Sequence, residues 1–197
     1  FASQITKKDI LTAFFDLSNT DGKYPYKLHY GASQNYQTER LTRQNNDLFS
    51  THLETNYFHT FNDKNSLDVK LYYYYSNRGL PSSVTLYYQN SAQRLWNRNI
   101  FFQTSYLSKI NKSLSYKNNI KIDYNYTRYK DSHVFTITNG VDDKYTQMFY
   151  YMNNAFSYKL KDNLFFTLTN DLSFNNLSSS SSLEDNPQRV SYITALV

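Results

Sequence analysis

Short polar clusters divide the chain at regular intervals. Four of them are rich in residues that favour tight turns, namely Thr6-Lys7-Lys8-Asp9, Asn62-Asp63-Lys64-Asn65, Asn111-Lys112-Ser113 and Lys161-Asp162-Asn163. Asn62 and Asn111 are 49 positions apart, and Asn111 and Lys161 are 50 positions apart. This spacing predicts a repeating unit that consists of a strand, a long loop, a second strand and a tight turn.

The segments beside these turns alternate between apolar and polar residues, which is the pattern of a strand with two different faces. After the second turn, one face carries Leu67, Val69, Leu71 and Tyr73, and the other carries Asp68, Lys70, Tyr72 and Tyr74. We expect eight long strands, which begin near Ile10, Leu48, Ser66, Asn97, Leu114, Tyr145, Leu164 and Arg189. The stretch Tyr24 to Tyr30 is expected to add short loop strands.

The length of these strands favours a membrane. Strands in soluble proteins usually run about 5 to 6 residues, whereas a tilted membrane-spanning strand needs about 9 to 11. Short turns on one side and long loops on the other are typical of outer-membrane barrels. The expected fold is therefore all-β, an antiparallel transmembrane β-barrel segment with its strands in meander hairpins. A soluble β-sandwich, whose strands also alternate, is the alternative.

The aromatic residues and the isolated charges also favour the barrel. The chain has 21 Tyr and 14 Phe, although its mean hydropathy is only -0.71. Rings gather near the expected strand ends, where the aromatic girdles of a barrel lie, as in Tyr72 to Tyr75, Phe101-Phe102 and Phe149-Tyr150-Tyr151. Charges such as Lys70, Lys121 and Asp171 fall on the opposite face, which a wet lumen tolerates and a sandwich core does not.

Several other kinds of function find no support in the sequence. There is no cysteine, and His29, His52, His59 and His133 lack the spacing of metal ligands. No combination of catalytic residues or phosphate-binding loop can be assigned, so we expect neither an enzyme nor a cofactor. The net charge of +5 is spread along the chain, which argues against a nucleic-acid surface.

Both ends of the chain have the character of cut strands. The sequence opens at Phe1 without an initiator methionine or an apolar signal core, and Arg189 to Val197 is a strand-like segment with no turn after it. We therefore expect residues 1–197 to be part of a larger barrel domain.

Several segments resemble the barrel of TonB-dependent outer-membrane receptors of Bacteroidetes, including those described as cobalamin-receptor-like. The resemblance is carried by four stretches in the same order, namely Arg43-Gln44-Asn45-Asn46-Asp47, the stretch from Tyr75 through Arg78-Gly79-Leu80-Pro81 to Val84, Gln93-Arg94-Leu95-Trp96-Asn97-Arg98-Asn99, and Tyr126-Thr127-Arg128-Tyr129-Lys130-Asp131. It implies a 22-strand barrel in the Gram-negative cell outer membrane. It also implies an N-terminal plug and a TonB box, neither of which is found in this chain.

The resemblance implies the partners and the function as well. The expected partners are outer-membrane lipid, the rest of the barrel and its plug, the TonB complex reached through the plug region, a surface lipoprotein and a small-molecule nutrient ligand. The expected function is import of a scarce large nutrient, such as a corrinoid, an iron chelate or haem. A passive porin-type barrel and a secreted β-rich adhesive or carbohydrate-binding protein are the alternatives.

The stretch between Asn77 and Arg98 is interpreted as an extracellular loop with candidate ligand-binding residues. It combines cationic and aromatic groups that can pair with or stack on a ligand, namely Arg78, Tyr87, Tyr88, Arg94 and Trp96. The competing and favoured interpretation is that the Tyr pair and Trp96 belong to the outer aromatic girdle and that Arg94 contacts lipid headgroups.

Overall fold

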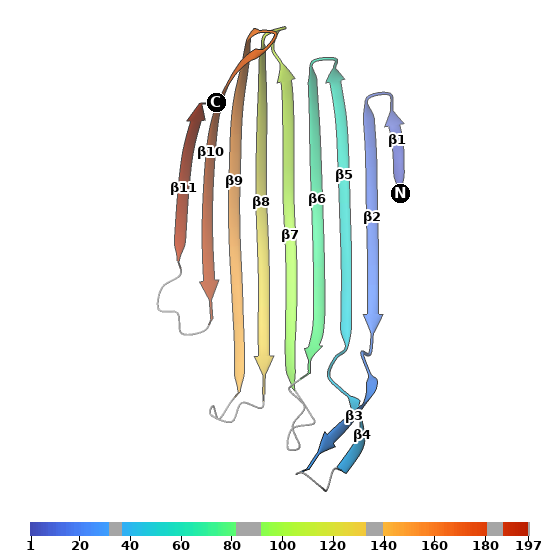
Figure 1. Cartoon of the computed structure of the whole chain (residues 1–197). Helices are drawn as coiled ribbons and strands as arrows, with labels where there is room; N and C mark the ends of the chain where they lie inside the picture. Colours follow the sequence, from blue (N-terminus) through green and yellow to red (C-terminus); the bar gives the residue numbers. More distant parts are fainter. Residues whose placement is uncertain (32–36, 82–91, 133–139, 181–186, 197) are drawn as a thin grey trace.

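The computed structural model describes residues 1–31, 37–81, 92–132, 140–180 and 187–196. These residues form eleven strands, which are coloured along the chain in Figure 1. The strands are β1 (Ala2–Thr6), β2 (Asp9–Thr20), β3 (Tyr24–Tyr30), β4 (Gln37–Arg43), β5 (Leu48–Asn62), β6 (Asn65–Leu80), β7 (Gln93–Lys109), β8 (Leu114–Asp131), β9 (Val141–Lys161), β10 (Leu164–Ser179) and β11 (Gln188–Leu196). None of the described residues belongs to a helix with the length and apolar character to cross a membrane.

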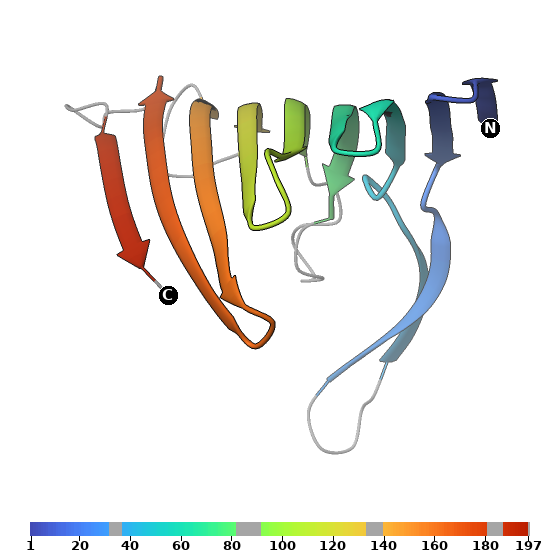
Figure 2. The same ribbon diagram turned by 90° about the horizontal axis from the view of Figure 1, so that it is seen from above.

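Nine of these strands form one antiparallel sheet in the order β1-β2-β5-β6-β7-β8-β9-β10-β11. Neighbours in the sheet are therefore neighbours in the chain, except where β3 and β4 are inserted as a separate two-stranded hairpin between β2 and β5. This hairpin extends away from the row of long strands (Figure 2). β1 and β11 form the two edges of the sheet. The predicted all-β, antiparallel meander is confirmed.

The eight expected long strands are all present, and the segment Phe1 to Thr6 supplies a ninth as β1. The predicted first residues of two strands were wrong by four positions, because β7 begins at Gln93 and β9 begins at Val141. The four additional residues at the start of each strand are held by backbone pairing with β6 and β8, which requires no particular side chain. The predicted loop strand at Tyr24 to Tyr30 is β3, whereas its partner β4 was not anticipated.

The register gives the long sheet two different faces. One face, which we call the apolar face, carries the aligned row Ala13, Thr55, Leu71, Phe102, Ile122, Tyr150, Phe174 and Val190. The neighbouring row lies on the polar face and consists of Thr12, Asn56, Lys70, Gln103, Lys121, Tyr151, Ser173 and Ser191. No apolar side chain among the described residues is buried. The apolar face therefore needs a cover that the described residues do not provide.

The hairpin turns are staggered along the strands. One row of partners crosses three hairpins through His59, Leu67, Tyr106, Asn118, Asn154 and Asn170. In each hairpin, the two residues of this row are separated along the chain by a different number of positions. The separation is eight positions from 59 to 67, twelve from 106 to 118 and sixteen from 154 to 170. Each turn thus lies about one residue further along per strand, and Figure 1 shows the turns stepping along one edge of the sheet.

This stagger defines a tilt. One residue rises about 3.3 Å, and neighbouring strands lie about 4.8 Å apart. If all the tight turns lie at one level, the strands are therefore inclined by about 35° to the normal of that level. Strands in membrane barrels tilt by about 35–45°.

Candidate functional site

A polar network extends across the polar face from β7 to β10. The Ser105 hydroxyl donates to Asn119 Oδ1 (2.8 Å), the Asn119 amide donates to Asn153 Oδ1 (3.0 Å), and the Asn153 amide donates to Asp171 Oδ1 (2.9 Å). Tyr151 Oη also donates to Asp171 Oδ1 (2.5 Å). Side chains on four strands thus satisfy one another's hydrogen-bonding groups, and these bonds hold the polar side chains of this face in place.

Asp123 is an enclosed charge on this face and is only 8% exposed. Its carboxylate accepts hydrogen bonds from the amides of Asn99 (2.7 Å) and Asn125 (3.0 Å), and it pairs with Lys121 Nζ (2.9 Å). On the neighbouring strands, Lys70 Nζ pairs with Glu54 (3.0 Å). Both signs of charge are thus present and compensated, as an enclosed charge requires.

A row of aromatic rings crosses the same face. Phe14 and His52 lie 5.2 Å apart between ring centroids, His52 and Tyr72 lie 4.8 Å apart, and Tyr72 stacks on Phe101 at 4.7 Å. Lys121 Nζ lies 4.5 Å from the centroid of the Phe101 ring. The alternation correctly predicted that Tyr72 lies on the polar face. The clusters Tyr72 to Tyr75 and Phe101-Phe102 were expected as groups in the aromatic girdle, but adjacent residues of a strand point to opposite faces. One ring of each aromatic pair therefore lies on the polar face.

A cavity of about 450 Å³ opens at the loop edge of the sheet. Its lining includes Arg78, Tyr74, Ser76 and Asn97 from the polar face, together with Thr20, Gly22, Asn46, Asp47, Leu48 and Gly79. Ser76 is 2% exposed, whereas Arg78 is exposed. A guanidinium beside hydroxyl and amide groups can bind an anionic or hydroxyl-rich group.

The other predicted site residues do not join Arg78 in this cavity. Arg94 forms an ion pair with Asp47. Trp96 is the strand partner of Asn77 and Arg128, which places it on the apolar face, opposite to the face of Arg78. Tyr87 and Tyr88 lie outside the described residues. The stretch 77–98 is also not a loop at either end, because Arg78, Arg94 and Trp96 all belong to paired strands.

The surroundings of Trp96 favour its interpretation as a girdle residue. The Arg128 guanidinium carbon lies 5.1 Å from the centroid of the indole, and Arg128 binds Asp142 through two hydrogen bonds of 2.6 and 2.5 Å. All three residues lie at the loop edge of the sheet. An indole with a cation beside it suits the level of lipid headgroups.

Asn45 joins the loop-edge segments and was not singled out from the sequence. Its side-chain amide donates to the carbonyl oxygens of Leu80 (3.1 Å) and Gln93 (2.8 Å), which end β6 and begin β7. The amide N–H of Gly79 donates to the carbonyl of Asp47 (2.8 Å). A Cβ atom added at Gly79 would lie 2.6 Å from Asn45 O and Oδ1. We call these contacts the Asn45 junction. Three of the segments that carry the family resemblance meet there.

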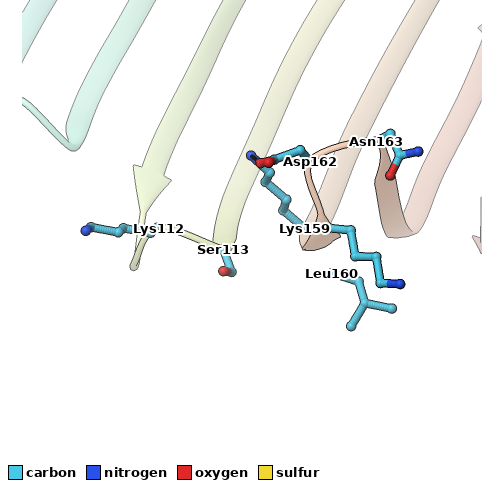
Figure 3. A pocket seen from close by; sticks show the side chains of 7 residues that line it. Lys112, Ser113, Lys159, Leu160, Asp162 and Asn163 are labelled. Atoms are coloured by element: carbon cyan, nitrogen blue, oxygen red, sulfur yellow. Dashed lines mark ion pairs between the residues drawn. The ribbon is translucent and has the colours of Figure 1, made fainter.

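At the opposite edge, a cleft of about 600 Å³ lies between two tight turns. Its lining contains Lys112, Lys159 and Lys161 with a single carboxylate, that of Asp162. Lys159 Nζ pairs with Asp162 (2.7 Å), and in Figure 3 Lys112 points away from this pair. Such an exposed and basic edge suits contact with anionic groups of a membrane surface.

The described histidines have other contacts. No group of three or more potential metal ligands occurs within the parts of the chain that the structure describes, which exclude His133. His59 instead belongs to a cluster at the first turn, where Asp9 accepts hydrogen bonds from Thr6 Oγ1, Tyr57 Oη (2.6 Å) and His59 Nδ1 (2.5 Å). Together these bonds hold the pKa of Asp9 well below its usual range.

Replacing Asp9 with Asn is expected to lower the stability of the protein at neutral pH. It is also expected to reduce the loss of stability that occurs when the pH is lowered. A carboxyl with a depressed folded pKa stabilises the protein above its unfolded pKa of about 3.9, and this contribution is lost as the pH falls through the folded pKa. Urea midpoints at about pH 7 and about pH 3 measure the effect. Asp63→Asn, at an exposed residue of the next turn, is the control. Equal acid sensitivity in both variants and the wild type would refute the role of the cluster.

No protein-family model matches the chain, and no curated protein matches it either.

Proposed function

We propose that this chain forms part of the wall of a transmembrane β-barrel in the outer membrane of a Gram-negative cell. The observation that carries the proposal is the division of eight aligned strands, β2 and β5 to β11, into one apolar and one polar face. Hydrocarbon would cover the apolar face, and a wet lumen would meet the charges and amides of the polar face. The tilt of about 35° derived from the stagger is the value that such a wall requires.

The barrel is proposed to belong to a TonB-dependent receptor that imports a scarce large nutrient, such as a corrinoid, an iron chelate or haem. The family resemblance supports this step, because three of the stretches that carry it meet at the Asn45 junction. Stretches that contact one another in the fold support an inference from resemblance better than isolated motifs do. Outer-membrane lipid, a plug, the TonB complex and a surface lipoprotein are the proposed partners.

A secreted adhesive or carbohydrate-binding protein fits less well. Exposed apolar side chains such as Leu71 (47%), Ile122 (40%) and Leu172 (41%) recur on strand after strand of one face. In water, a surface of this kind would need a second layer over the whole sheet.

An uptake experiment separates an energised receptor from a passive porin. Cells with and without the gene for the protein are supplied with cobalamin, a ferric siderophore or haem, and accumulation is measured before and after an uncoupler collapses the proton gradient. The proposal expects gene-dependent accumulation of one of these probes that the uncoupler abolishes. Uptake of many small solutes that the uncoupler leaves unchanged would identify a porin instead.

Arg78→Ala is expected to weaken binding of the imported probe by about tenfold or more, because a hydrogen bond to a charged group contributes about 1.5–3 kcal/mol. Equilibrium binding to the purified protein measures the change. Arg98→Ala is the matched control, since Arg98 lies at the same edge but pairs with Tyr75 and Tyr126 on the apolar face. Equal affinities of the two variants would show that the cavity at Arg78 is not a ligand site.

A further inference from the structure

Two asparagines interrupt the apolar face on β9 and β10. Asn154 on β9 and Asn170 on β10 are direct strand partners, and Asn118 on β8 and Thr194 on β11 continue the same row. The residues two positions to either side of the two central asparagines are all apolar, namely Met152, Phe156, Leu168 and Leu172. The row is thus a polar island in an apolar surface.

The positions of the neighbouring rings place this island at the middle of the membrane. On β9, Tyr150 and Tyr158 lie four positions to either side of Asn154, and on β10 Phe166 and Phe174 lie four positions to either side of Asn170. Eight residue steps at a tilt of about 35° span roughly 22 Å along the membrane normal, close to the apolar band of about 25 Å between aromatic girdles.

The hydrogen bonds among the described residues of the island leave the amide donors of Asn154 and Asn170 unused. Asn154 Oδ1 accepts from Tyr116 Oη (2.7 Å) and Asn118 Nδ2 (2.9 Å). Asn170 Oδ1 accepts from Tyr192 Oη (3.1 Å) and Thr194 Oγ1 (2.8 Å).

No described residue accepts a hydrogen bond from the Nδ2 group of Asn154 or of Asn170. The three hydroxyl oxygens that donate to these asparagines keep lone pairs that can accept. The island therefore offers donors and acceptors side by side.

We infer that this island is the contact surface between two copies of the protein within the membrane. The inference rests on the proposed membrane location, because hydrocarbon supplies no partner for an amide N–H. A second copy does supply one. A two-fold axis places the same patch opposite itself, so that the Asn154 and Asn170 amides of each copy meet the hydroxyl oxygens of the other. The flanking apolar residues then pack around these bonds.

The test uses the intact protein extracted from its own membranes in mild detergent. Light scattering is expected to report a dimer for the wild type and a monomer for the double variant Asn154→Leu with Asn170→Leu. Thr104→Leu is the matched control, because Thr104 is a polar residue of the same face outside the island, and this variant is expected to remain dimeric.

Cysteine cross-linking in the membrane tests the same contact without removing both amides. The chain has no cysteine of its own, so Asn170→Cys is expected to form a disulfide-linked dimer on oxidation, whereas Leu71→Cys, on the same face of β6, is not. A membrane-extracted monomer with no cross-link at 170, or a cross-link at 170 to a different protein, would overturn the inference and leave the membrane location standing. Recovery of the protein in water without detergent would overturn both.

Discussion

Ile122→Arg is expected to destabilise the protein in a bilayer by about 2–4 kcal/mol, the largest effect of any surface substitution that we anticipate. Ile122 is 40% exposed and lies in the middle of the apolar part of β8, between Ile120 and Tyr124 on the same face. A guanidinium placed there would meet hydrocarbon, and the cost of arginine near the midplane of a barrel wall is of this size.

Two matched variants isolate the cause of this loss. Ile122→Leu keeps the volume and the apolar character, so its cost is expected to stay below about 1.5 kcal/mol. Ser173→Arg introduces the same guanidinium on the polar face of β10, where it would meet water and is expected to cost little. Denaturant titrations of the three variants in phospholipid vesicles provide the comparison. If arginine were tolerated equally at 122 and 173, the apolar face would not contact lipid.

Gly79→Val is expected to displace the segment between β4 and β5 that anchors the β3–β4 hairpin, and to cost about 1–3 kcal/mol, as overpacking usually does. A Cβ atom at this position lies 2.6 Å from two oxygens of Asn45, one of them in the backbone. Because Asn45 has a positive φ of 54°, it has little freedom to move aside while keeping its bonds to Leu80 and Gln93. The segment that carries Asn45 must therefore shift.

Hydrogen exchange of the β3 and β4 amides is the appropriate measurement, because it separates a local release from global unfolding. Asn45→Ala removes the two capping bonds without adding bulk and is expected to increase exchange in the same strands. Lys112→Ala, at a tight turn on the far edge, is expected to leave that exchange unchanged. Protection of β3 and β4 that survives Gly79→Val would refute the role of the Asn45 junction.

The strands of this fold could be predicted because each one carries its own signal. Alternation with period two, bounded by clusters such as Asn62 to Asn65, depends only on neighbours in the chain. The ends of the strands were harder to predict from the sequence. Gln93 and Val141 begin their strands through pairing with β6 and β8, and nothing in the residues themselves marks where that pairing stops.

The candidate site was harder to predict because it depends on register. Alternation alone shows that Tyr72 and Tyr73 point to opposite faces, but only the alignment of three strands brings Tyr72 onto Phe101 and under His52. The Asn45 junction joins residues that are 34 positions apart, from 45 to 79, through backbone groups that leave no pattern in the sequence. Arg78 lines the cavity at the loop edge, whereas grouping it with Trp96 as one ligand site ignored the two faces of a strand.

The central claim is that one face of the sheet contacts lipid and the other contacts water. Because the chain has no cysteine, single cysteines can be placed along β8 and labelled in intact membranes with a water-soluble thiol reagent. Cysteines at 119, 121 and 125 are expected to react, whereas those at 120, 122 and 124 are expected to be protected from this reagent. When the protected cysteines are labelled with a fluorophore after extraction and the protein is reconstituted, a lipid-soluble quencher is expected to reduce their fluorescence. Equal labelling of even and odd positions would contradict the account.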